Sequence, residues 1–93
     1  MIMQELEKNT HYKILQVELP AGTNMQRHYA TSEAFVIVES GNALLICKGE
    51  TAELVQGSRI AIPSHEPHML KVIRDFKALV VMAGDAIITY SVL

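Results

Sequence analysis

The segment GSRIAIPSHEPH, residues 57–68, carries the clearest fold signal in this 93-residue chain. Gly57 supplies a turn, and the mainly apolar residues 58–62 that follow it are typical of a short β-strand. Pro63 and Pro67 then enclose a rigid turn, because proline fixes its own φ angle and has no backbone N–H. His68 opens the next predicted strand, and this arrangement can aim its imidazole into the interior of a barrel.

The rest of the chain repeats this pattern of short strands between turns. Strands are predicted at 11–19, 26–30, 33–39, 42–48, 51–55, 58–62, 68–74, 76–83 and 86–92. No segment keeps a helical apolar period for long, and residues 1–10 could form one helical turn at most. Turns at a spacing of about 8–12 residues indicate an all-β sandwich or barrel. We therefore predict a short N-terminal segment, 1–10, followed by one barrel domain, 11–93.

Composition restricts the class of protein. Half of the residues are apolar, which favours one compact core, and the net charge of −2 with scattered cations argues against a nucleic acid or membrane partner. The single cysteine, Cys47, cannot form an internal disulfide and fits a reducing compartment. The N-terminus shows no secretory signal and the apolar runs are too short to span a bilayer, so we expect a cytoplasmic protein.

A second segment, residues 22–41, lies upstream of the first and forms a pair of motifs with it. The spacing of its residues, taken with that of residues 57–68, resembles the two motifs of the cupin family over about residues 20–83. The matching positions are Gly22, His28, Gly41, Gly57, Pro63 and His68. The resemblance implies a single-domain, cupin-type jelly-roll β-barrel of about eight to nine short antiparallel strands.

The chain departs from the cupin motifs at three positions. Ala30 stands where a second histidine belongs, Ala34 where a glutamate belongs, and His65 where a glycine usually follows the proline. By resemblance, a cupin metal centre uses three histidines and one carboxylate to hold iron, manganese, zinc, nickel or copper. Only His28 and His68 remain of that set, whereas a catalytic metal site generally needs about three protein ligands.

Two residues could complete such a site. His65 lies on the turn at the predicted barrel mouth, three residues before His68. Glu33 could replace the missing glutamate only if a bulge near residues 31–32 shifted the strand register by one. The soft donors Met25, Cys47 and Met82 could favour copper(I), but such residues in a β-rich core usually serve packing.

Side-chain alternation along the predicted strands separates an inner from an outer face. His28, Ala30, Ala34, Val36 and Val38 share one parity, and the cupin resemblance implies that this parity faces the barrel interior. The opposite face carries Phe35 and Ile37, so the strand is apolar on both sides and needs a second cover. Since small cupins commonly dimerise through one sheet, we expect a homodimer.

These observations leave three functional interpretations and do not decide whether the protein is an enzyme. The leading one is small-molecule binding in the barrel, because two alanines in place of ligands enlarge an apolar pocket. The predicted ligand-binding residues are His28, His68, Val36, Val38, Ile60, Ile62 and Leu70. The first alternative is a metal-dependent enzyme of dioxygenase or isomerase type. Its metal ligands would be His28 and His68, with His65 or Glu33 as weaker candidates. The second alternative is a structural or regulatory dimer with a vestigial pocket, and no catalytic residue is predicted in any of the three.

Overall fold

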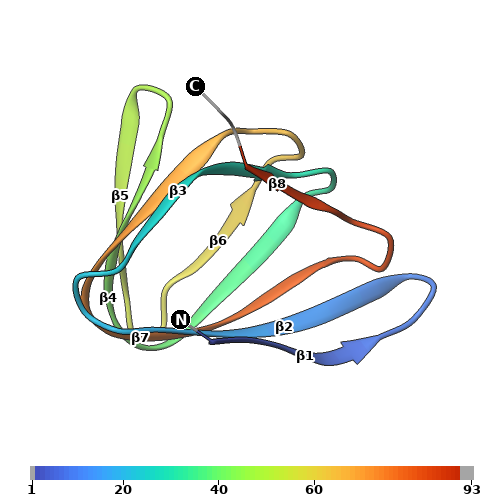
Figure 1. Cartoon of the computed structure of the whole chain (residues 1–93), viewed down its shortest axis with the longest axis horizontal. Helices are drawn as coiled ribbons and strands as arrows, with labels where there is room; N and C mark the ends of the chain where they lie inside the picture. Colours follow the sequence, from blue (N-terminus) through green and yellow to red (C-terminus); the bar gives the residue numbers. More distant parts are fainter. Residues whose placement is uncertain (1, 91–93) are drawn as a thin grey trace.

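Eight antiparallel β-strands form the regular structure of residues 2–90, which are the residues that the computed structural model describes. They are β1 (Ile2–Lys8), β2 (Tyr12–Leu19), β3 (Asn24–Ala30), β4 (Ala34–Cys47), β5 (Glu50–Val55), β6 (Arg59–Ile62), β7 (His68–Ala83) and β8 (Ile88–Tyr90). The strands curl into a jelly-roll barrel, with β1 and β2 along one side and β3 and β8 along the opposite side (Figure 1). The predicted all-β jelly-roll fold is confirmed.

The two longest strands, β4 and β7, connect the two sides of the barrel. They pair along most of their length, from Phe35 opposite Val81 to Cys47 opposite His68. Each was predicted as two separate strands, but each is continuous and bends where the β4–β7 register shifts around Gly41. Gly41 has a φ of 92°, and a Cβ at this position would clash with the backbone carbonyl of Asp75. The turn residues predicted near 40–42 therefore mark a bend within a strand, because glycine permits both the backbone angle and the close approach.

The N-terminal segment differs from its predicted form. Residues 2–8 form β1, an exposed edge strand that pairs with β2, and not a helical turn. A helix nucleus is costly in so short a segment, whereas the neighbouring strand offers backbone hydrogen-bond partners at once. At the other end, β8 covers residues 88–90 of the predicted strand 86–92. Positions 91 and 92 of that predicted strand lie outside the described residues.

The core lies inside the barrel and follows the alternation of the strands. Ala34, Val36 and Val38 on β4 are buried, as are His28 and Ala30 on β3, which confirms the predicted inner face. Phe35 on the opposite face of β4 is 40% exposed. Residues 2–90 contain no helix with the length and apolar character needed to cross a membrane.

Candidate ligand-binding site

Two histidines face each other across neighbouring strands in the barrel interior. His28 on β3 is paired in register with His68, the first residue of β7. Their ring centroids are 4.2 Å apart with the planes at 62°, and both residues are buried, at 7% and 8% exposure. The structure therefore brings together the two residues that matched the motif positions.

Each imidazole is oriented by the same kind of local hydrogen bond. His28 Nδ1 donates to the carbonyl oxygen of Gln26 at 2.6 Å, and His68 Nδ1 donates to that of Glu66 at 2.9 Å. Because a carbonyl oxygen can only accept, the proton of each neutral ring lies on Nδ1 and the lone pair on Nε2. In both rings Nε2 is then the atom left to meet a ligand.

Both Nε2 atoms are also accessible. Neither has a hydrogen-bond partner among residues 2–90, yet those residues contain no fully buried side-chain nitrogen or oxygen without a partner. Each of the two nitrogens therefore has some exposed surface. Burial lowers the pKa of His28; the hydrogen bond to Gln26 opposes this shift, and positive charge on His68 would add to it. The environment thus favours the uncharged form of His28.

A cavity of about 90 Å³ adjoins the pair. The described side chains that line it, apart from the two histidines, are all apolar, and they come from β1, β2, β3, β4, β5, β6, β7 and β8. Of the predicted binding residues, Val36, Ile62 and Leu70 line the cavity with the histidines. Val38 does not, because it is packed in the core, and Ile60 is only partly buried against that core.

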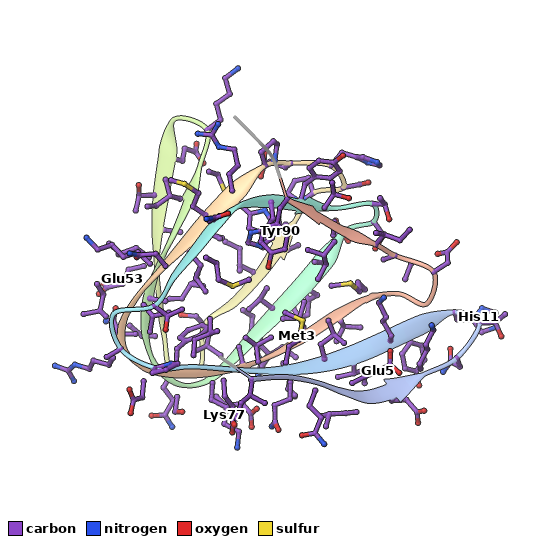
Figure 2. The ribbon with its side chains drawn as sticks, in the orientation of Figure 1. Met3, Glu5, His11, Glu53, Lys77 and Tyr90 are labelled. Atoms are coloured by element: carbon purple, nitrogen blue, oxygen red, sulfur yellow. The ribbon has the colours of Figure 1, made fainter. Side chains whose placement is uncertain are left out.

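Several cavity residues could not be recognised from the motifs. Met25 reaches the interior because a register shift in the β3–β7 pairing lies between it and His28, and the sequence carries no signal for that irregularity. Met3 extends into the barrel from β1, a segment that we had placed before the domain (Figure 2). Leu15 and Val17 on β2 could have been found, since they share one face of the predicted strand 11–19.

The structure does not join the candidate additional ligands to the histidine pair. His65 is exposed, and its ring lies 5.6 Å from that of Tyr29, whose side chain alternates to the opposite face from His28. Its Nδ1 is 2.7 Å from Ser64 Oγ. Glu33 is exposed and precedes β4, so no register shift turns it inward.

Two other residues lie in the same row of cross-strand neighbours as the histidines. Tyr90 is opposite His28 on β8, with ring centroids 5.4 Å apart, and is half exposed at the barrel wall (Figure 2). Cys47 is opposite His68 on β4. Burial raises the pKa of the Cys47 thiol, and the Glu66 carboxylate beside it raises this pKa further. Cys47 is therefore a protonated thiol at neutral pH and a poor nucleophile.

Comparison with known proteins defines the class. The family model described as the cupin domain matches residues 15–84, and the chain belongs to the cupin family. No match was found among curated proteins.

Solved structures agree with this assignment. A conserved protein of unknown function from Streptococcus pyogenes is 27% identical, with a TM-score of 0.80 over 88% of this chain and 72% of that one. The DMSP lyase DddQ from Ruegeria pomeroyi is 26% identical, with a TM-score of 0.78 over 85% of this chain. This chain spans only 43% of the lyase. An RmlC-like cupin from Methanocaldococcus jannaschii, with a double-stranded β-helix fold, has a TM-score of 0.80 at 22% identity over 89% of this chain and 79% of that one.

The residues present do not fit the metal centre of the family. Within residues 2–90, no group of three or more His, Cys, Asp or Glu side chains is arranged to hold a metal ion. Ala30 and Ala34, at the positions of the absent ligands, line the same cavity as His28 and His68. The chain thus keeps the location of a cupin centre but offers two imidazoles and no carboxylate there.

Proposed function

We propose that this cupin binds a small, mostly apolar organic molecule inside its barrel, with His28 and His68 as the polar anchors. The observation that carries the proposal is an apolar cavity lined by two imidazoles whose Nε2 atoms have no hydrogen-bond partner among the described residues. Binding sites for small molecules combine this kind of apolar lining with a few convergent polar groups. A water molecule occupies about 30 Å³ in the liquid and benzene fills a cavity of about 150 Å³, so a 90 Å³ cavity fits a ligand of only a few non-hydrogen atoms.

The experiment is a ligand-observed NMR screen of compact organic molecules against the wild-type protein. We expect hits whose binding is lost in His68→Phe and retained in His11→Phe, because His11 is exposed and outside the cavity. Hits that bind all three proteins equally would place the site elsewhere. No hits at all would favour a dimer with a vestigial pocket.

The metal-dependent alternative has less support from the side chains. Two imidazoles without a carboxylate fall short of the usual ligand count, and neither His65 nor Glu33 lies with them. The similarity to the DMSP lyase does not alter this, because the present chain covers less than half of that protein. The ligand-binding proposal therefore takes precedence over the metal-dependent alternative. The cytoplasmic location expected from the sequence remains a prediction.

We also propose that the protein forms a homodimer through the outer face of the sheet. Cross-strand pairing aligns Ile14, Val81, Phe35 and Ala61 in one row over β2, β7, β4 and β6. In the next row, Leu79 and Ile37 extend the apolar surface at the centre, and Gln16 and Arg59 flank them. Such a contiguous apolar face is typical of a contact with another protein surface, and a second copy supplies a self-complementary one.

Sedimentation velocity tests this association. We expect a dimer for the wild type and a monomer for Phe35→Lys, because a charge would be buried in the contact. Ile73→Lys is the matched control, since Ile73 is similarly exposed at 47% but lies outside these rows. A monomeric wild type, or equal dissociation in both variants, would contradict the proposal.

A further inference from the structure

We infer that the ligand of the barrel is a compact neutral molecule whose polar group is an O–H or N–H donor, and not a carboxylate or a carbonyl acceptor. This inference rests on the proposed function and specifies its ligand class. It follows from the two local hydrogen bonds that fix the imidazoles, because both of them consume the Nδ1 proton.

The hydrogen-bonding capacity of the cavity is one-sided. Its two polar side chains, His28 and His68, each keep an acceptor at Nε2 in the neutral form, and the remaining described lining side chains have no O–H or N–H group. A ligand donor placed beside the rings can hydrogen-bond to an Nε2 that has no partner among the described residues. A ligand acceptor placed there faces two lone pairs and gains none.

The free-energy cost of burying a ligand group without a hydrogen-bond partner decides the ligand class. Burying a polar group without a hydrogen bond is unfavourable, and burying an uncompensated carboxylate is far more so. An anion could be accommodated only if an imidazole gained a second proton, which places a cation in an apolar cavity. The geometry therefore selects against acids and in favour of small alcohols and small N–H heterocycles.

Pyrrole and furan provide an isosteric test. Both are five-membered aromatic rings of a size suited to a small cavity, but pyrrole carries an N–H donor where furan carries an oxygen. We expect pyrrole to bind the wild-type protein about 3–10-fold more tightly by NMR titration, which is the effect of one buried hydrogen bond. Isobutyrate serves as the compact anion, and we expect no saturable binding of it near neutral pH.

The variants assign the preference to the histidines. His68→Phe and His28→Phe keep an aromatic ring and remove one Nε2 each, so the preference for pyrrole should shrink in both and vanish in the double variant. His11→Phe should leave it unchanged. Should the variants fail to fold, long-range ¹H–¹⁵N spectra of the wild-type histidines still report the tautomer, and Nε2-protonated rings would overturn the inference.

The possible results distinguish the inferred ligand class from the proposed ligand-binding function. Equal or tighter binding of furan or isobutyrate in the cavity would overturn the ligand class while leaving the binding function in place. Binding of none of the three compounds would overturn the ligand class, and a screen without any hits would overturn the binding function as well. Tighter binding of pyrrole that depends on both histidines would support both.

Discussion

A single backbone angle explains what is unusual about His65. This residue occupies the position where the cupin motif has glycine, and its φ is 63°, in the left-handed region. Its N–H donates to the carbonyl of Ala30 at 2.8 Å, so the turn holds the residue in this conformation. A side chain with a Cβ is strained there, whereas glycine is not.

We therefore predict that His65→Gly stabilises the protein. The free energy of unfolding should rise by about 0.5–1 kcal/mol, because the strain is relieved at little cost in contacts for an exposed ring. Urea denaturation measures the change. His65→Ala is the control, since it removes the imidazole but keeps the Cβ, and a glycine variant no more stable than the alanine variant would contradict the explanation.

The lowered pKa of His28 makes stability depend on pH. The unfolded imidazole titrates near 6.5, and burial lowers the folded value, so between the two the unfolded state binds more protons. This contribution to stability is complete above pH 6.5 and is lost as the pH falls toward the folded pKa. The titratable side chains whose rings lie against His28 are His68 on β7 and Tyr90 on β8.

We predict that thermal stability falls between about pH 7 and pH 5, and that His28→Phe reduces this fall. Melting curves across the range, followed by circular dichroism, measure the effect. His11→Gln should keep the wild-type slope. A His28→Phe slope identical to that of the wild type would show that burial of His28 does not govern the pH dependence.

At the scale of the strands, the bend of β4 depends on Gly41. The φ of 92° and the close approach of the Asp75 carbonyl both require a residue without a Cβ. The bend lets one strand contribute to both sides of the barrel and lets β7 follow it in register. Gly57 has a similar φ of 88°, but a Cβ at that position would meet nothing within 4 Å.

Alanine substitutions at these two glycines test the role of Gly41 in the bend. Gly41→Ala should lower the free energy of unfolding by about 2–4 kcal/mol, because it adds a backbone clash to the cost of a left-handed alanine. Gly57→Ala should lower the free energy of unfolding by only about 1–2 kcal/mol, because it adds the cost of a left-handed alanine without a clash. Equal losses in chemical denaturation would mean that the β4–β7 contact can relax around a methyl group.

At the scale of the whole molecule, the four positions that would hold a metal ion in a cupin line one cavity in the barrel interior. Ala30 ends β3 and Ala34 begins β4, yet both line the cavity that contains His28 and His68. Restoring ligand side chains at these two positions would add an imidazole and a carboxylate to the two imidazoles already present. Three or four protein ligands are sufficient for a transition metal.

We predict that Ala30→His with Ala34→Glu creates or strengthens metal binding. Isothermal titration with manganese, iron and nickel should show a gain over the wild type, and the gain should shrink when His68→Ala is added, because three of the four ligands then remain. Absence of a gain in a folded double variant would show that these four positions do not converge closely enough to share an ion.

Much of the architecture was predictable because its signals are local. Turn glycines and prolines delimit the strands, and alternation correctly assigned the inner face that carries His28, Ala30 and Val36. Three features had no clear local signal: the register irregularity before His28, the continuity of β4 and β7, and the pairing of β1 with β2. They depend on which strand lies alongside, which is a property of the assembled sheet.

The sequence by itself determined the family, the strand pattern and the identity of the two histidines, because motif spacing and period-two alternation are written along the chain. Only the tertiary structure decided that His28 and His68 meet ring to ring, that His65 and Glu33 stay apart from them, and that an apolar cavity lies beside the pair. The reason is physical. These relations arise from the pairing of strands far apart in sequence, and the space left between them depends on how all of their side chains pack together.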